Sequence, residues 1–353
     1  MMISSIRLQH FRSYTEANFD FSDQVTIIVG PNASGKTNLL ESILVVARGS
    51  SYRAKDHELI HFDDTWARLD AQTGSGIRTI KLVAEPEASK TYELGGKTYK
   101  RLSLQHTLPV VLFEPNHLML LSGSPDQRRV YLDDLLEQTT PGYSALRRNY
   151  RRVLAQRNAL LKRARAPINE ELFPWNLRLS ELGAAIARHR NQLSETIQAN
   201  IGAYYQQIAR TSTSTTLRYH SQFSLDSYES QLLHKLEASL SLDVARGFTA
   251  AGPHRDDFIV LFDDKPAAET ASRGETRTFV LALKIIELEV LEQAREARPL
   301  LLLDDVFSEL DATRRHALTE TLANYQTFIT TTDADVVHDT AFSKHVRTIS
   351  TSV

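Results

Sequence analysis

The octapeptide GPNASGKT, from Gly30 to Thr37, constrains the fold of this chain more than any other stretch. It matches the pattern G-x-x-x-x-G-K-[ST] in full, and this pattern is informative when it lies between a strand and a helix. Both neighbours are present, because the apolar run Val25 to Val29 reads as a buried strand and Asn38 to Ala47 reads as a helix. The octapeptide therefore predicts a phosphate-binding loop in an α/β fold rather than a chance glycine turn.

Each residue type in this loop has a physical use in holding phosphate. Successive backbone N–H groups at a helix N-terminus form an anion nest, and the helix dipole also favours negative charge there. Gly30 and Gly35 permit the backbone angles and the close approach. The Lys36 ammonium can reach the β- and γ-phosphates, and the Thr37 hydroxyl can hold Mg²⁺. We therefore expect ATP and Mg²⁺ as cofactors, with the nucleotide bound by Gly30, Pro31, Asn32, Ala33, Ser34, Gly35, Lys36, Thr37 and Asn38.

Two aspartates follow a fully apolar run late in the chain, in the segment LLLLDD from Leu300 to Asp305. Four apolar residues predict a buried central strand of a parallel sheet, and ligands bind at the carboxyl end of such strands. Asp304 would hold Mg²⁺ directly or through water, and Asp305 could polarise the attacking water as a general base. The alternative is a pair of solvated acids at a strand end, which the presence of Lys36 and Thr37 in the same chain disfavours.

Composition sets the broad class of protein. The chain has 353 residues, enough for about two or three domains. It contains no cysteine, which excludes disulfides and cysteine-built zinc sites and suits the cytoplasm. The first residues hold no apolar run, and no stretch of about 18 apolar residues occurs, so we expect no signal peptide and no membrane partner. The net charge is −2, so any affinity for nucleic acid must come from a local patch.

The pattern of apolar and polar residues changes twice along the chain. Short alternating segments with glycine turns dominate up to about residue 122, and strand texture returns from about residue 246. Between them, Leu182 to Ile208 carries apolar residues at steps of three, four and seven, which predicts one buried helical stripe. We therefore predict that residues 1–122 and 246–353 form one α/β head, β-rich in its N-terminal part. Residues 123–245 would be inserted into it as a mainly helical arm.

The helix expected before LLLLDD opens with the four residues Ser272, Arg273, Gly274 and Glu275. Serine at an N-cap with glutamate three residues later is a capping box, which satisfies two backbone N–H groups and is a sufficient reading by itself. The order of motifs offers a second reading. The phosphate loop, this tetrapeptide, the acidic strand end, SELD (residues 308–311) and ITTTD (residues 329–333) together resemble the head of an ABC-type ATPase. That resemblance implies that the tetrapeptide binds the γ-phosphate held by a second subunit, and that Asp311 lies at the dimer seam.

Further segments narrow the resemblance. IRLQHFRSY, GPNASGKTNLLESI, GSPDQRRVYLD, GPHRDDF, SRGETRTFVLALKIIE, LLLLDDVFSELD and FITTTD occur in this order between residue 3 and about residue 335. Together they resemble the RecF family of bacterial recombination-repair proteins. Arg273, Glu275 and Asp305 depart from the residues of most ABC proteins, which argues against membrane transport and fast turnover. SMC-like heads share the nucleotide motifs but need long coiled-coil arms, and residues 123–245 lack sustained heptads.

The resemblance to RecF implies an ATP-dependent homodimer that binds DNA at single-strand gaps and junctions. It implies a weak DNA-dependent ATPase that acts with RecO and RecR in loading recombinase, and it places Arg12, in FRSY, at the bound nucleotide. The alternative from another class is an ATP-dependent structural clamp of the SMC-like type, in which hydrolysis barely occurs. Measuring ATPase activity with and without DNA separates the two. A small-molecule kinase is disfavoured, because it has no use for the Ser272 motif or for the long insertion.

A basic segment is the candidate DNA contact. Residues 147–165 hold eight arginines and lysines and no acid, and the spacing puts Arg148, Arg152 and Arg157 roughly on one side of a helix. Arg53 and Lys55 add charge on the head. Such a patch suits contact with backbone phosphates without base readout. The alternatives are a solvated helix face and arginines that pair with acids of a neighbouring helix.

His254, in GPHRDD, is the remaining candidate for chemistry. A histidine beside Arg255 and two aspartates could be catalytic, or it could be a turn residue ordered by Asp256. A lone histidine is weak evidence for catalysis, so we favour a structural or interdomain role.

Overall fold

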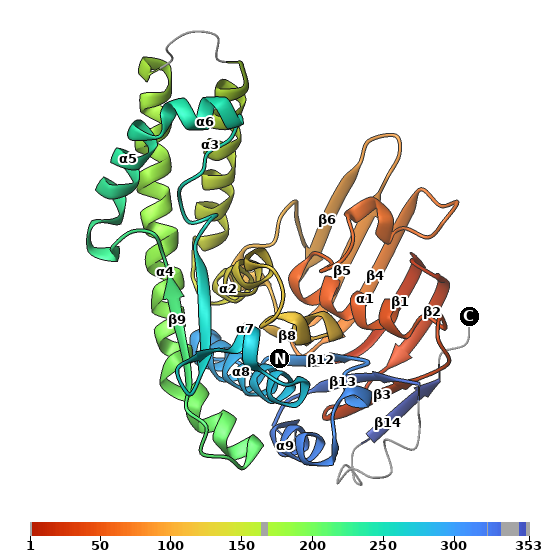
Figure 1. Ribbon diagram of the computed structural model, residues 1–353. Coiled ribbons are helices and arrows are strands. Elements are labelled where there is room, and N and C mark those ends of the chain that lie inside the picture. The colour runs from red at the N-terminus through yellow and green to blue at the C-terminus, as the bar shows by residue number, and fades with distance from the viewer. Residues whose placement is uncertain (1, 164–168, 323, 333–345, 351–353) are drawn as a thin grey trace. The chain divides into compact units, whose positions relative to one another are not determined.

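The structure is a computed structural model that describes residues 2–163, 169–322, 324–332 and 346–350 (Figure 1). Arg165 of the basic segment and Asp333 of ITTTD lie outside these residues. The chain forms two compact units: the first unit comprises Met1–Leu118 and Val280–Val353, and the second unit comprises Met119–Phe279. Within the described ranges, none of the helices has the length and apolar character needed to cross a membrane.

A parallel sheet in the first unit contains both strands that the nucleotide motifs predicted. Its strands, in spatial order, are β14 (Val346–Ser350), β3 (Val25–Val29), β13 (Thr327–Thr331), β12 (Leu300–Asp304) and β8 (Val110–Phe113). All neighbouring strands are parallel. Every residue of β12 and β13 is buried, as expected for central strands that are covered on both faces. The carboxyl ends of β3, β13 and β12 therefore meet at one edge of the sheet.

An antiparallel sheet gives the first unit its β-rich N-terminal part. Its strands, in spatial order, are β2 (Tyr14–Asp20), β1 (Ile3–Phe11), β4 (Trp66–Thr73), β5 (Gly76–Val83), β6 (Ser89–Leu94) and β7 (Lys97–Tyr99). The two hairpin turns that the sequence predicted are present, Gly-Ser-Gly at residues 74–76 and Gly-Gly at residues 95–96. Gly76, Gly95 and Gly96 all have positive φ angles, which explains why glycine stands at these turns.

Helix α1 (Lys36–Arg48) packs on strands of both sheets, and its buried face completes the core of the first unit. The strand β3, the loop and α1 follow one another directly, so the strand–loop–helix order expected from the octapeptide is confirmed. Helix α1 ends at Gly49, which has a φ of 82° and donates its N–H to the Val45 carbonyl. The remaining short elements of this unit are η1 (Asp56–Leu59), η2 (Leu104–His106), η3 (Pro115–Met119), η5 (Phe307–Glu309) and α9 (Ala312–Leu322).

The second unit is mainly helical. Its elements are α2 (Pro125–Thr139), α3 (Tyr143–Arg163), α4 (Asn169–Ala209), β9 (Thr215–His220), η4 (Leu225–Ser227), α5 (Tyr228–Ala238), α6 (Leu240–Arg246), β10 (Asp257–Phe262), β11 (Lys265–Pro266) and α7 (Ala267–Thr270). Helices α3 and α4 lie side by side as a long pair (Figure 1). The predicted stripe from Leu182 to Ile208 falls on α4, and its seven apolar members are buried. The expected helical stripe is therefore confirmed.

Strand pairing explains where the second unit ends. Strand β9 follows α4 in the chain and pairs antiparallel with β10, which carries β11 on its other side. Residues 246–279 therefore belong with the helical segment by contact, whereas the sequence division ended the arm at residue 245. The division at residues 123 and 245 stays a prediction about the arm. Helix α8 (Arg273–Arg295) begins in the second unit and ends in the first.

Candidate nucleotide-binding site

The phosphate loop, residues 30–37, is tightly fitted to its surroundings. At Gly35, which has a φ of 88°, a Cβ atom would lie 2.7 Å from the Tyr14 hydroxyl oxygen, so no side chain fits. That hydroxyl donates a 3.0 Å hydrogen bond to the Gly35 carbonyl. The buried Lys36 ammonium donates to the carbonyls of Gly30 and Pro31, both at 2.9 Å. The Lys36 ammonium therefore lies inside the loop, next to the position expected for a bound phosphate.

Asp304, at the end of β12, contacts the phosphate loop directly. The Thr37 hydroxyl donates to Asp304 Oδ1 over 3.0 Å, and the Thr330 hydroxyl donates to the same oxygen over 2.9 Å. The Tyr52 hydroxyl donates to Asp304 Oδ2 over 3.1 Å. Magnesium prefers carboxylate and hydroxyl oxygens, so Asp304 and Thr37 are a suitable pair of ligands on adjacent elements. The sequence analysis expected these two residues at one metal site, singled out ITTTD without giving Thr330 a role there, and did not point to Tyr52.

Asp305 and Glu114 extend the acidic end of the sheet. Asp305 has a positive φ of 51°, and its N–H donates to the Thr330 hydroxyl over 2.9 Å. Burial and the charge of Asp304 raise the pKa of Asp305 against the opposing effect of Lys36. Glu114 follows β8, the strand beside β12, and burial and Asp304 raise its pKa as well. A raised pKa strengthens a carboxylate as a base. Sequence reasoning missed Glu114, although its place after a short apolar strand was the available signal.

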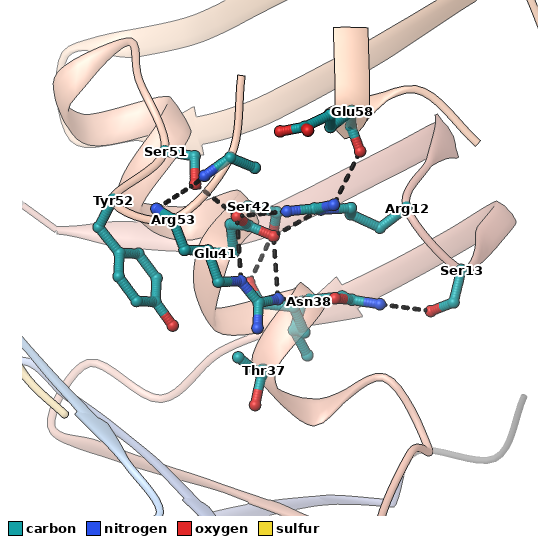
Figure 2. A network of polar contacts seen from close by, with 12 residues as sticks. Arg12, Ser13, Thr37, Asn38, Glu41, Ser42, Ser51, Tyr52, Arg53 and Glu58 are labelled. Atoms are coloured by element: carbon teal, nitrogen blue, oxygen red, sulfur yellow. Dashed lines mark hydrogen bonds and ion pairs between the residues drawn. The ribbon is translucent and has the colours of Figure 1, made fainter. Parts of the chain in front are cut away.

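A buried carboxylate organises the side of the loop that faces η1. Glu41, on α1, is fully buried, and two arginines hold it (Figure 2). Arg12 donates to both of its oxygens at 2.8 and 2.9 Å, and Arg53 donates to both at 3.1 and 3.2 Å. Burial would raise the pKa of Glu41, but the hydrogen bonds from Arg12, Arg53 and Ser51 outweigh burial and hold it below its ordinary value. The carboxylate is therefore an anion that fixes two guanidinium groups.

The same arginines reach the residues that flank the loop. Arg53 donates to Asn38 Oδ1, and Asn38 Nδ2 donates to the Ser13 hydroxyl, both over 2.9 Å (Figure 2). Arg12 also donates to the Glu58 carbonyl over 2.8 Å. The sequence placed Arg12 and Asn38 at a nucleotide and Arg53 at DNA, and the structure joins all three in one hydrogen-bonded network.

A cavity of about 500 Å³ opens beside this network, within the first unit. Its volume lies in the range of small-molecule sites in proteins. Residues from the FRSY turn, α1, η1 and the segment after η1 line it, among them Arg12, Ser13, Asn38, Glu58, Ile60 and Phe62. Phe62 is 84% exposed, so an aromatic face is available to a ligand. Pattern matching could not find this cavity, because its lining residues are spread along the chain from Arg12 to Ala84.

The Ser-Arg-Gly-Glu tetrapeptide forms the capping box that the sequence predicted. The Ser272 N–H donates to the Glu275 carboxylate over 2.8 Å, and the Glu275 N–H donates to the Ser272 hydroxyl over 3.2 Å. Ser272 and Arg273 are exposed at the start of α8. Asp311 has a similar local role, because its carboxylate accepts the Arg314 N–H at the start of α9. The tetrapeptide belongs to the second unit, whereas Asp311 and the phosphate loop belong to the first.

The structure corrects one of the expected DNA contacts. Arg157 is fully buried and pairs with Asp243, 2.9 Å away, and it also donates to Asn176 and Thr249. The spacing argument was wrong here, because α3 turns this position towards its neighbours. Arg148 and Arg152 are exposed, as are three other cations of the helix: Arg151, Lys162 and Arg163. On the head, Lys55 is exposed and Arg53 is engaged with Glu41.

His254 is held inside the second unit. Its Nε2 lies 3.0 Å from the Thr249 carbonyl, so this nitrogen carries the proton and Nδ1 accepts the Tyr150 hydroxyl at 2.7 Å. Burial lowers the pKa of His254 to about 4, and the charges of Arg255, Arg129 and Arg190 act in the same direction. The neighbouring Asp256 accepts the hydroxyls of two tyrosines, Tyr219 and Tyr228. These contacts support the structural role that the sequence favoured.

The fold and the site together define a class of protein. A phosphate loop after a central strand, an acidic strand end that contacts it, an antiparallel sheet and a helical arm make this chain an ABC-type P-loop ATPase head. The model of the RecF/RecN/SMC N-terminal domain family matches residues 2–352. The chain belongs to this family and, within it, to RecF.

Individual relatives support the assignment. The chain is 37% identical to the DNA replication and repair protein RecF of Heliobacterium modesticaldum, over 94% of this chain and 92% of the relative. A solved structure of the recombination mediator protein RecF with ATP, in the RecFOR pathway, matches with a TM-score of 0.87 and 28% identity, covering 99% of this chain and 95% of that chain. An SMC head bound to the C-terminal winged-helix domain of ScpA matches with a TM-score of 0.55 and 16% identity, covering 99% and 94%, and shares the fold. The fold class expected from the sequence is therefore confirmed.

Proposed function

We propose that this chain binds ATP with Mg²⁺ and hydrolyses it slowly, as a DNA-dependent ATPase of recombinational repair. The contact of Thr37 with Asp304 carries the proposal, because it brings the loop hydroxyl and the acidic strand end to one point. The cavity beside Arg12 and Asn38 offers space for the base and ribose next to the phosphate loop. The relative solved with ATP supports this choice of nucleotide.

The residues of the site divide the chemistry among them. The loop N–H groups and Lys36 would bind the β- and γ-phosphates, and Thr37 and Asp304 would hold Mg²⁺, which neutralises phosphate charge when bound. Asp305 would accept a proton from the attacking water as general base. Aspartate is shorter than glutamate, so the base lies farther from the phosphate, which supports slow turnover. The SMC-like clamp without hydrolysis remains the alternative outcome.

Variants of Lys36 test the nucleotide site. Lys36→Ala should leave the fold intact and abolish DNA-stimulated release of phosphate, whereas Lys97→Ala, an exposed lysine on β7, should leave it unchanged. Unchanged turnover in Lys36→Ala would contradict the assignment. ATP binding without any measurable turnover in the wild type would favour the clamp.

We propose further that two subunits dimerise around ATP, with Ser272 of one subunit completing the site of the other. The exposed start of α8 offers N–H groups and a hydroxyl to an anion, and Arg273 and Gly274 would lie beside it. One substitution separates this role from capping. Ser272→Asp keeps a good N-cap but repels phosphate, so it should block the ATP-dependent dimer in sizing experiments and leave monomer stability unchanged. Ser272→Asp that still dimerises with ATP would refute the role in the partner's site.

DNA contact is proposed for the basic face of α3, which we define as Arg148, Arg151, Arg152, Lys162 and Arg163. Exposed cations without base-reading partners suit double-stranded DNA and its junctions, where phosphates dominate affinity. Arg148→Ala/Arg152→Ala should lower the salt slope of DNA binding by about 2, one for each lost phosphate contact. The control Arg178→Ala/Arg188→Ala removes the same charge from exposed positions of α4. Equal slopes for the two double variants would move the DNA site elsewhere, with Arg53 and Lys55 as the next candidates.

RecO and RecR are the proposed protein partners. The support is the pathway named for the solved relative, which is the RecFOR pathway. Co-sedimentation of this chain with purified RecR and RecO, with and without ATP and a gapped duplex, tests the proposal. Absence of both partners from the sedimented complex under every condition would contradict it.

A further inference from the structure

Tyr52 reaches the metal-binding end of the sheet from an unexpected place. It lies in the segment between α1 and η1, yet its hydroxyl donates to Asp304 Oδ2 over 3.1 Å. The other oxygen, Oδ1, accepts the hydroxyls of Thr37 and Thr330. Three hydroxyl groups from three segments therefore hold one carboxylate, and Tyr52 is the one of the three that donates to Oδ2.

The donors to Asp304 are not equivalent once a metal binds. Thr37 is itself an expected magnesium ligand, so its oxygen would turn a lone pair to the metal and its hydrogen bond to Asp304 would change. Thr330 and Tyr52 are not expected to bind the metal, so their hydrogen bonds can keep the carboxylate in place. Hydrogen bonds to a ligating carboxylate of this kind orient it and tune metal affinity.

The structure also fixes Tyr52 itself. Its two chain neighbours, Ser51 and Arg53, both donate to the buried Glu41 of α1 (Figure 2). The guanidinium carbon of Arg53 lies 5.7 Å from the centre of the Tyr52 ring. Because α1 starts at the phosphate loop, the helix that carries Thr37 also anchors the segment that carries Tyr52.

We propose that Tyr52 is a positioning residue of the metal site. Its hydroxyl holds Asp304 in the orientation in which the carboxylate and Thr37 face one Mg²⁺ bound with ATP. Glu41 supports this arrangement from behind, because it fixes the residues on both sides of Tyr52. The inference rests on the proposed function, in which Asp304 and Thr37 hold the metal. It goes beyond that function by giving this chain's metal affinity a dependence on one tyrosine hydroxyl.

The test compares two tyrosines of the first unit whose hydroxyls donate to different acceptors. Tyr52→Phe removes the donor to Asp304. Tyr92→Phe is the matched control: Tyr92 is also in the first unit, and its buried hydroxyl donates over 2.9 Å to the Gly49 carbonyl and not to Asp304. The full chain is loaded with ATP, and bound Mn²⁺ is counted by electron paramagnetic resonance across a titration. Binding of a fluorescent ATP analogue in the presence of a chelator is measured in parallel.

Tyr52→Phe should weaken Mn²⁺ binding about 10-fold or more, in line with other hydrogen-bonding partners of metal ligands. It should leave nucleotide binding in chelator unchanged, and Tyr92→Phe should match the wild type in both measurements. Equal Mn²⁺ affinity in the two variants overturns the proposal. Weaker nucleotide binding by Tyr52→Phe in chelator also overturns it, because that result assigns Tyr52 a general structural role. A wild-type chain that binds neither ATP nor Mn²⁺ would instead remove the proposed function, and this outcome is visible before any variant is made.

Discussion

Two buried carboxylates in this molecule are each held by two arginines, and they serve different ends. Glu41, in the first unit, accepts from Arg12 and Arg53. Asp133, in the second unit, accepts from Arg190 at 2.8 and 3.0 Å, and Arg147 lies 2.9 Å from it. In both cases the arginine hydrogen bonds and charges hold the pKa of the carboxyl below its ordinary value in spite of burial.

The two clusters differ in how far their arginine side chains are exposed. The Arg12 and Arg53 side chains are 21% and 37% exposed. Arg12 lines the cavity in the first unit, and Arg53 donates to Asn38, which directly follows the phosphate loop. The Arg190 and Arg147 side chains keep 6% and 12%, and their other donors go to Pro253 and Glu137. In the second unit these ion pairs are therefore enclosed in the core. In the first unit they leave two arginines partly exposed next to the phosphate loop. We call them the closed cluster, around Asp133, and the open cluster, around Glu41.

The largest expected effect is the loss of the charge at Asp133. Asp133→Asn removes the ion-pair partner of the buried Arg190 and leaves Arg147 paired with Glu137 alone. Breaking a buried pair in this way costs about 3–5 kcal/mol. The free energy of unfolding from urea titration measures it, with hydrogen exchange locating the loss to α2–α4. Asp126→Asn is the control, because Asp126 is 79% exposed and its pair with Arg129 is worth little. Equal losses in the two variants would mean that the closed cluster adds no stability.

The second unit should also weaken in mild acid through His254. Its pKa in the folded chain is about 4, below the ordinary value of 6.5, so the unfolded chain takes up the proton first. The stability that His254 contributes is therefore fully present above pH 6.5 and is lost as the pH falls towards 4, by at most about 3 kcal/mol. The measurement is the pH dependence of unfolding for the wild type and for His254→Gln, whose difference isolates this group. Parallel curves between pH 6.5 and 4 would show that His254 does not titrate differently on folding.

Loss of the charge at Glu41 should cost less and act on the ligand as well. Glu41→Gln frees arginines that can reach water, so we expect about 1–3 kcal/mol of lost stability. It should also weaken ATP binding several-fold, because Arg12 and Arg53 are no longer fixed beside the cavity. Glu16→Gln, which breaks the exposed pair with Arg7 in the same unit, should change neither quantity. An unchanged affinity for ATP in Glu41→Gln would show that the open cluster, like the closed one, only stabilises the fold.

The sequence predicted the parts of this comparison that are encoded locally. The phosphate loop, the acidic strand end and the capping box at Ser272 are each short runs whose residue types fix backbone geometry or burial. The stripe on α4 follows from helical periodicity alone. These expectations needed no knowledge of what lies across the fold, and the structure has all four features.

The partners of buried carboxylates could not be predicted in this way. Tyr52 and Asp304 are 252 residues apart in the chain, and Arg157 and Asp243 are 86 apart. Helical spacing grouped Arg157 with Arg148 and Arg152, but spacing does not say which face packs inward. For the same reason the sequence did not reveal that Glu41, an acid on the helix after the phosphate loop, is buried. A pattern can therefore place a charge on a helix, whereas only the tertiary fold decides whether that charge is closed in or left open.

The smallest expected effect compares one hydroxyl in each cluster. Tyr143 donates to Asp133 Oδ1 over 2.7 Å, and Ser51 donates to Glu41 Oε1 while accepting two backbone N–H groups. Tyr143→Phe should cost about 1 kcal/mol, since it removes one hydrogen bond from a carboxylate that keeps its arginines. Ser51→Ala should cost at least as much, because it also removes the acceptor of two backbone N–H groups. Only Ser51→Ala should also weaken Mn²⁺ binding with ATP, because Ser51 anchors the segment that carries Tyr52. Unfolding and Mn²⁺ titrations of both variants give the answer. If Tyr143→Phe lowers metal affinity as much as Ser51→Ala does, the distinction between the closed and the open cluster does not hold.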